Sequence, residues 1–290
     1  VLLTLTWVVP LLMGLAQLAR PGKMWRLAPW AALPALVTAI VVPVNTTVEL
    51  SWLILGATLW FDLTTQAFLF FTAALWLVAG VFGAAYLGKG DEQRGQFFAY
   101  YLLAMAGNMG LIVVGDMLSY YTWFAVMSFA SYGLVLHTRT DFARQAGQVY
   151  IKLVVVGEVL LFAALVLIYS QTGTLRLDEL AQASISQLAA ALIFVSFGIK
   201  AGVVLLHVWL PLAHPAAPVP ASAVLSGAMI KAGLLGWLRF LQVGEMTPDW
   251  GAFLVVVGLV SAFYGALIGI WQHDPKAVLA YSSISQMGLI

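Results

Sequence analysis

The chain has 290 residues, of which 62% are hydrophobic and only 9% are charged, and its formal net charge is +1. An ordinary soluble domain carries about 25% charged residues, so this composition, with apolar runs of about twenty residues along the whole length, indicates an all-α polytopic membrane protein. Without a basic patch outside the loops, nucleic acid is not an expected partner, and the absence of cysteine excludes disulfides, thiolate metal sites and cysteine nucleophiles.

Apolar stretches long enough to cross a bilayer follow one another along the chain, and we expect nine to ten transmembrane helices. The predicted spans cover residues 1–19, 26–44, 62–88, 96–115, 117–137, 146–170, 186–208, 220–241 and 250–271, with a tenth beginning near Lys276. Residues 48–62 are β-branched and bulky, so a short hairpin outside the membrane and a helix extension both remain open. Residues 175–180 are too few and too charged to span, and they predict an interfacial turn.

The charges of the loops predict the orientation in the membrane, because lysine and arginine collect on the cytoplasmic side. With the N-terminus outside, the outer loops hold Arg176, with Arg239 close to an outer helix end. The basic residues of the inner loops are then Arg20, Lys23, Arg26, Lys89, Arg94, Arg139, Arg144 and Lys276. We therefore expect a multi-pass protein of a bacterial or archaeal type of inner membrane with its N-terminus outside. Asp62 and Arg239 lie at span ends and are expected to be interfacial.

Three charged residues are predicted to lie deep in the membrane, at similar depths. Glu158 is near the middle of the sixth span, Lys200 of the seventh and Lys231 of the eighth. A lysine near the bilayer centre costs about 2.5 to 3.5 kcal/mol on insertion scales, so each should face a protein interior and have a partner. Helices joined by short loops tend to be neighbours, which favours mutual approach. Lys152 lies nearer the cytoplasmic end, where snorkelling to the interface and an accessory role both remain open.

The segment between the two deep lysines is interrupted by four prolines and by His207 and His214. Broken helices at membrane depth are tolerated where the freed backbone groups line a cavity or are covered by protein. This segment is therefore the expected centre of a functional site. Asn108 and Ser128, in the fourth and fifth spans, are accessory candidates that can bond a neighbouring helix or a file of water.

Three ordered motifs carry a resemblance to a known family. Lys200 is followed seven residues later by His207-Val-Trp-Leu-Pro211, then by AHPAAPVPASAVLSGAMIKAG ending at Gly233. The third motif, DPKAVLAYSSISQMG, ends at Gly288. With these motifs the chain resembles the antiporter-like proton-translocating subunits shared by respiratory complex I, multisubunit sodium/proton antiporters and membrane-bound hydrogenases. The AHPAAP and LSGAMIK segments are most similar to the hydrogenase-4 type.

The resemblance implies a fold of fourteen helices with two inverted five-helix repeats, at spans four to eight and nine to thirteen. We therefore expect an N-terminal three-helix region at residues 1–95, the complete first repeat with a broken seventh helix at 96–245, and the start of a truncated second repeat at 246–290. The chain begins with Val1 rather than Met and closes on an apolar stretch without a polar flank, which favours a truncated protein.

The family also implies roles for individual residues. Its broken seventh helix carries a lysine matching Lys200, its eighth a lysine or histidine matching Lys231, and both are taken as proton-path residues. Two positions depart from the pattern, because Ala125 stands where a glutamate is usual and Leu205 where a proline commonly precedes the histidine. The lost glutamate would leave Lys200 without its usual partner. Glu158, one helix later at similar depth, is the predicted replacement.

These features predict a proton-translocating subunit of a membrane-bound energy-converting complex, within an oxidoreductase or a cation/proton antiporter. A proton taken up near His207 would pass through the Glu158 and Lys200 site to Lys231. The expected partners are other membrane subunits and the lipid bilayer, and Na⁺ or K⁺ stays open as a coupled ion. No cofactor or metal is expected, because the chain offers no ligand set and no His-x-x-x-His pair. The alternative is a non-transporting structural or assembly subunit, suggested by Ala125 and the missing second repeat.

Overall fold

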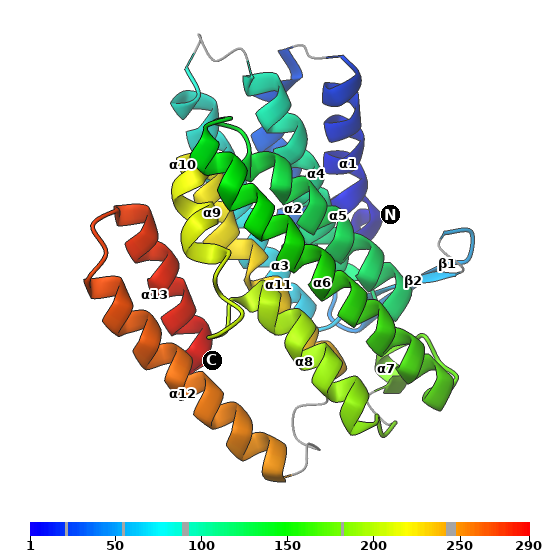
Figure 1. Ribbon diagram of the computed structural model, residues 1–290. Helices are drawn as coiled ribbons and strands as arrows, with labels where there is room; N and C mark the ends of the chain where they lie inside the picture. The colour runs from blue at the N-terminus through cyan, green and yellow to red at the C-terminus, as the bar shows by residue number, and fades with distance from the viewer. Residues whose placement is uncertain (21–22, 54–55, 89–92, 181–182, 242–247) are drawn as a thin grey trace.

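The computed structural model describes residues 1–20, 23–53, 56–88, 93–180, 183–241 and 248–290, which form a helical bundle with one β-hairpin (Figure 1). The elements of the first half are α1 (Leu2–Ala19), η1 (Lys23–Arg26), η2 (Ala28–Ala32), α2 (Leu33–Val41), β1 (Thr46–Leu50), β2 (Ala57–Phe61), α3 (Leu63–Tyr86), α4 (Arg94–Val113) and α5 (Met117–Val135). Those of the second half are α6 (Asp141–Thr172), α7 (Leu177–Leu180), α8 (Gln187–Ala201), α9 (Leu210–Ala216), α10 (Val219–Val224), the π-helical turn η3 (Leu225–Met229), α11 (Lys231–Phe240), α12 (Pro248–Ile270) and α13 (Pro275–Leu289).

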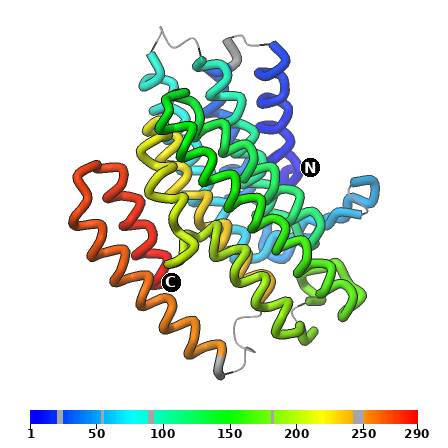
Figure 2. Tube along the Cα trace, in the orientation of Figure 1, coloured from blue at the N-terminus to red at the C-terminus, as the bar shows by residue number. Residues whose placement is uncertain are grey.

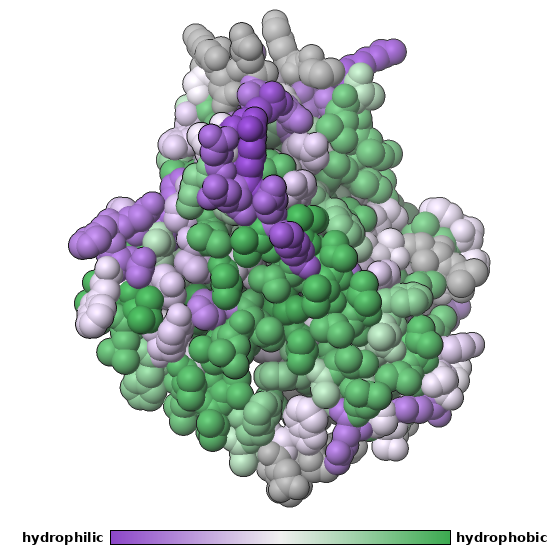
Figure 3. All heavy atoms as spheres, viewed as in Figure 1, coloured by the Kyte–Doolittle hydropathy of each residue, from purple (hydrophilic) through white to green (hydrophobic). Residues whose placement is uncertain are grey.

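Six helical segments of the described residues are long and apolar enough to cross a membrane. They are Leu2–Ala19, Leu63–Tyr86, Arg94–Val113, Asp141–Thr172, Val219–Phe240 and Trp250–Ile270, and two shorter apolar segments accompany them, Ala28–Val41 and Gln187–Ala201. Hydrophobic side chains cover most of the middle of the face seen in Figure 3, and hydrophilic ones gather mainly at its upper end. The structure is thus that of a multi-pass helical membrane protein, and the number of nine to ten spans stays a prediction.

The observed helices differ from the predicted spans mainly where prolines interrupt the chain. Within predicted span 26–44, the short 3₁₀ turn η2 precedes α2, and Pro29 and Pro34 lie in the first turns of η2 and α2, where their missing N–H groups are tolerated. The seventh span was predicted to end at residue 208. Instead α8 ends at Ala201, and α9 carries the span on to Ala216.

The helix α4 lies at the centre of the bundle, in contact with α1, α3 and α5. Almost every residue from Phe97 to Val113 is buried. Two glycines allow α5 to approach closely, since a Cβ atom at Gly107 would lie 2.4 Å from the backbone nitrogen of Met127, and one at Gly110 would lie 2.5 Å from the ring of Trp123. This close packing fixes the position of α5, which carries Ser128.

A β-hairpin stands between α2 and α3, so the hairpin alternative for residues 48–62 is confirmed. Strands β1 and β2 are antiparallel, with Thr46 opposite Phe61. The hairpin also contacts the loop between α4 and α5, where the N–H of Thr58 donates to Oδ2 of Asp116 at 2.9 Å. It therefore covers the junction of those two helices.

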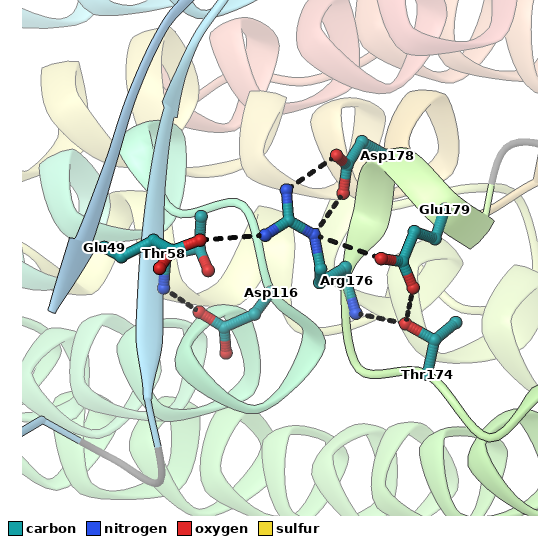
Figure 4. A network of polar contacts seen from close by, with 7 residues as sticks. All are labelled: Glu49, Thr58, Asp116, Thr174, Arg176, Asp178 and Glu179. Carbon is teal, nitrogen blue, oxygen red and sulfur yellow. Dashed lines mark hydrogen bonds and ion pairs between the residues drawn. The ribbon is translucent and has the colours of Figure 1, made fainter. Parts of the chain in front are cut away.

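A polar network around Arg176 joins this hairpin to α7 (Figure 4). The guanidinium lies 2.8 Å from Asp178, 3.4 Å from Glu179 and 3.5 Å from Glu49 of β1. Its hydrogen bonds hold the pKa of Asp178 below the usual value despite partial burial. Because these side chains are largely exposed, each ion pair contributes little to stability. The single turn of α7 agrees with the turn predicted over residues 175–180.

The last two helices, α12 and α13, lie side by side on one flank of the bundle (Figure 2). They pack closely, since a Cβ atom at Gly265 would lie 2.6 Å from the backbone nitrogen of Ser285. α13 contacts α9, the second half of the broken span, and α12 reaches the break itself.

Candidate functional site

The seventh span is broken between α8 and α9, and hydrogen bonds close the exposed helix end. The break begins at Gly202, whose left-handed backbone (φ 74°) costs glycine little. The N–H of Gly202 donates to the carbonyl of Gly198 at 3.0 Å, and the indole N–H of Trp209 donates to the carbonyl of Ile199 at 2.7 Å. These two carbonyls thus have partners, as backbone groups away from water require. Lys200 is thereby fixed in the last turn of α8, where the helix dipole favours a cation.

Lys200 is buried between α5 and α6, with 4% of its surface exposed. Its ammonium donates to Oγ of Ser128 at 3.3 Å and lies 5.7 Å from the ring centre of Phe124 and 5.9 Å from that of Tyr150. The hydroxyl of Tyr150 donates to the carbonyl of Ser128 at 2.9 Å. Hydroxyl and aromatic groups therefore surround the amine.

Glu158 approaches the same place from α6 and is also 4% exposed. Both carboxylate oxygens are buried without a hydrogen-bond partner, and within the described residues no ion pair joins Glu158 to Lys200. The two side chains instead line one cavity, together with Phe124, Ser128, Tyr150, Val154, Gly157, Ser196, Ile199 and Trp209.

The cavity is small. It offers about 10 Å³ to the centre of a water-sized sphere, which is at the lower limit of about 10 to 15 Å³ that one water molecule needs. A buried carboxylate without partners is costly, so a water molecule shared with Lys200 would stabilise Glu158.

Lys231 lies apart from this cavity, at the start of α11. It is half-buried, and its ammonium donates to the carbonyl of Ser226 at 2.7 Å. The π-helical turn η3 changes the hydrogen-bonding pattern there, as such turns often do at functional sites. His214 of α9 is fully buried, with Nδ1 2.7 Å from Oγ of Ser222 and Nε2 without a partner. Of the three charged residues predicted to lie deep, the structure thus gathers Glu158 and Lys200 at one cavity and places Lys231 elsewhere.

A second, wider cavity of about 350 Å³ opens at the junction of α9 and α10. It is lined by Tyr86, Leu87, Gln93, His137, Thr138, Pro215, Ala216, Ala217, Pro218 and Lys276. The ammonium of Lys276 donates there to the carbonyls of Ala217 at 2.7 Å and Pro215 at 3.4 Å. Lys276 thereby ties the start of α13 to the end of the broken span.

The remaining predicted residues lie in different settings. His207 lies in the break, 7% exposed, with Nε2 3.2 Å from the hydroxyl of Tyr264. Lys152 is exposed on α6, as snorkelling to an interface requires. Asn108 is buried and accepts a hydrogen bond of 2.9 Å from the indole of Trp76, which ties α4 to α3.

Sequence reasoning missed one strong charge pair. Arg239 donates to both carboxylate oxygens of Asp62, at 2.7 and 2.8 Å, and its guanidinium lies 4.5 Å from the ring centre of Trp60. The side chains are only 7% and 20% exposed, so the pair is largely buried in the protein, and the interfacial position expected for both residues stays a prediction. Burial raises the pKa of Asp62, but hydrogen bonds from Arg239 and the N–H of Thr65 outweigh it and hold the pKa below its usual value. The only signal in sequence was opposite charge at two span ends.

Residues 114–290, more than half of the chain, match the family described as NADH:quinone oxidoreductase/Mrp antiporter, TM. The chain belongs to this family. The resemblance drawn from the motifs around Lys200 and Lys231 is therefore confirmed.

Within this antiporter family, the chain is 34% identical to hydrogenase-4 component B of Escherichia coli over 213 residues, which cover 71% of the chain and 31% of that protein. It is 29% identical to a Na(+)/H(+) antiporter subunit of Alkalihalophilus pseudofirmus over 208 residues, which cover 68% of the chain and 42% of that protein. The matched region thus spans well under half the length of these curated relatives.

Solved structures share the fold. A chain of the Mrp complex from Dietzia sp. superposes with a TM-score of 0.86 at 25% identity, covering 99% of this chain and 57% of that one. A chain of an archaeal membrane-bound sulfane sulfur reductase superposes with a TM-score of 0.84 at 23% identity, covering 99% and 62%. The helices of this chain therefore have the arrangement found in chains of these two membrane complexes.

Proposed function

We propose that this chain carries a proton-translocating unit of an antiporter-like subunit in a multisubunit membrane complex, with residues 96–245 as its translocation repeat. The observation that carries the proposal is that Lys200 and Glu158 are buried at one cavity without forming an ion pair. A purely structural pair would be expected in contact, since unpaired buried charges are costly. Two separated, titratable groups are suited to exchanging a proton.

The proposed mechanism follows from the distance between the two groups. Approach of a carboxylate and an amine in a poorly hydrated site stabilises the ionised pair, and separation stabilises the neutral pair. Small movements of α6 against α8 would thus move a proton between Glu158 and Lys200. Ser128, which accepts a hydrogen bond from Lys200, and one water molecule in the cavity would provide the path.

Lys231 would receive the proton next, and His207 would serve uptake from the cytoplasmic side. The wider cavity between α9, α10 and Lys276 supports entry at this end, because it opens beside the second half of the broken span. Other membrane subunits of a hydrogenase-like or antiporter complex are the proposed partners. Whether Na⁺ or K⁺ moves with the proton depends on those subunits.

The test is Lys200→Ala in the full-length protein within its reconstituted complex. Proton translocation should fall at least about tenfold while the complex still assembles, because the amine is the proposed proton carrier. Lys200→Arg should also impair transport, since a guanidinium stays charged. Lys152→Ala is the matched control, an exposed lysine whose loss should leave transport near the native rate. Native transport by the Lys200→Ala complex would remove Lys200 from the mechanism.

We also propose that the N-terminus faces outside, on the lysine and arginine bias of the loops. Residues 137–148 would then be cytoplasmic and residues 242–250 outside, of which 242–247 fall outside the described residues. Single-cysteine labelling is clean because the chain has no cysteine. A thiol introduced by Asp141→Cys should react only after the membrane is opened, and labelling from outside in intact cells would reverse the orientation.

A second candidate is a structural subunit that kept the fold and lost transport. Ala125, where the family usually has a glutamate, is the observation in its favour. This candidate predicts that Lys200→Ala, Glu158→Gln and the native complex all transport protons equally.

A further inference from the structure

The break of the seventh span is attached to α12 by two polar contacts. The N–H of Val204 donates to Oγ of Ser261 at 3.1 Å, and Nε2 of His207 lies 3.2 Å from the hydroxyl of Tyr264. Ser261 and Tyr264 are three residues apart, so both project from one face of α12. One helix face thus contacts both a backbone group and a side chain of the break.

The backbone of the break needs such support. Leu205 adopts a left-handed conformation (φ 74°), which is unfavourable for a residue with a Cβ atom and persists only when the surroundings hold it. The side chain of Leu205 is 85% exposed, so its packing contributes little to stabilising this backbone conformation. The N–H of Leu206 donates to the carbonyl of Val203 at 2.9 Å within the break, and α12 adds the contacts at Val204 and His207 on either side of Leu205.

The contact with Tyr264 also orients the imidazole. The two rings meet at a steep angle with centroids 5.0 Å apart, and Nδ1 of His207 is buried without a partner. A hydrogen bond at one ring nitrogen decides the state of the other, so Tyr264 sets which form Nδ1 presents. Among the described residues, the titratable rings that face His207 are Tyr264 of α12 and Tyr281 of α13.

The break transmits its position to Lys200 through short connections. Lys200 lies two residues before Gly202, and the carbonyl of its neighbour Ile199 is held by Trp209 on the far side of the break. A shift of the break would therefore move the last turn of α8 and with it the amine.

We propose that Ser261 and Tyr264 form a latch that positions the break, and through it Lys200, so that α12 controls the geometry of the proton-transfer site. This inference rests on the proposed function. It assigns positioning roles to Ser261 and Tyr264, while the proton is carried by the groups already named.

The test uses Ser261→Ala and Tyr264→Phe in the full-length complex, with Ser283→Ala as matched control for the serine. The control removes a buried hydroxyl of the neighbouring helix α13 that donates to the carbonyl of Leu279 in its own helix at 3.0 Å. Because small misplacements of reacting groups cost large factors in rate, the latch variants should transport protons on the order of tenfold more slowly, with normal assembly. Tyr264→Phe should also shift the pH of half-maximal transport by roughly half a unit. Ser283→Ala should leave the rate within about twofold and the pH profile unmoved.

Rescue distinguishes positioning from general packing. Tyr264→Gln keeps a polar group on α12 and should recover part of the rate lost in Tyr264→Phe. If the phenylalanine variant fails to assemble, Tyr264→Gln replaces it in the test. Tyr264→Phe should add little to the defect of His207→Ala, because it acts through that residue.

Native rates and pH profiles in both latch variants would overturn the latch while leaving the proposed function intact, provided that Lys200→Ala abolishes transport. Native transport by Lys200→Ala would instead overturn the proposed function. Equal losses in Ser261→Ala and Ser283→Ala would show a packing effect and also refute the latch.

Discussion

Among the residues that the structure describes, the chain buries charged side chains at two places, and they form an ion pair at only one of these places. At the end of α11, Arg239 and Asp62 form two hydrogen bonds with each other. At the cavity between α6 and α8, Lys200 and Glu158 are buried at least as deeply but form no ion pair with each other. At the first site the two charged side chains bond each other, and at the second the carboxylate and the amine do not.

Under the proposed function, the difference would separate the groups that stabilise the protein from those that transport protons. A buried pair in contact is strongly destabilised when one partner is removed, because the other charge is stranded. A buried group that has no ion-pair partner already bears most of that cost, so its removal should affect function more than folding. The pair at the end of α11 thus holds α3, β2 and α11 in place, whereas the cavity pair exchanges a proton under the proposed function.

The largest effect that would sharpen this contrast is expected from Glu158→Gln. Proton transport by the reconstituted complex should fall at least about tenfold, since the amide cannot take up and release a proton. The midpoint of thermal unfolding should stay unchanged or rise slightly, because a buried carboxyl without partners is removed. Transport and thermal unfolding are measured on the same purified complex.

A carboxylate returned from the neighbouring helix should repair this defect. Ala125→Glu in the Glu158→Gln background places the group where the family usually has it, and part of the transport should return. Native transport by Glu158→Gln alone would end the idea that Glu158 replaces the missing glutamate.

A loss of stability with transport preserved is expected from Arg239→Met. It strands Asp62 and should lower the free energy of unfolding by about 3 to 5 kcal/mol, while the rate per assembled complex stays near native. Arg176→Met is the control, since its exposed ion pairs are worth about 0 to 1 kcal/mol each. Denaturation in detergent measures the free energy of unfolding of both variants. Similar losses in Arg239→Met and Arg176→Met would contradict the stabilising role of the buried pair.

The smallest effect concerns the pH dependence of stability. The pKa of Asp62 is lowered in the fold from its ordinary value of 3.8, so the ionised pair stabilises the protein above that pH. This stabilisation should disappear as the pH falls below 3.8 through the lowered pKa. The difference in stability between the native protein and Asp62→Asn should therefore vanish in that range. Thermal unfolding at several pH values measures this difference. A constant difference across the range would show that Asp62 acts without its charge.

The sequence by itself determined the class of fold and the family, and it predicts the depth of the charged residues. The length of the apolar stretches predicts helices that cross a bilayer, and the prolines between Lys200 and Lys231 indicate a break. These are local properties, written in consecutive residues. The sequence did not determine the exact extent of the break. The helix α9 contains two prolines, and its continuation as a helix depends on packing against α13.

Only the tertiary structure decided which charges meet. Asp62 and Arg239 are separated by 177 residues, and their pairing follows from the packing of α3 against the segment that ends in α11. The same holds for Glu158 and Lys200 at one cavity, for Lys231 outside it, and for His207 beside Tyr264. Hydropathy gives the depth of a residue in the membrane but not its rotation about the helix axis, and that rotation is set by side-chain packing between helices.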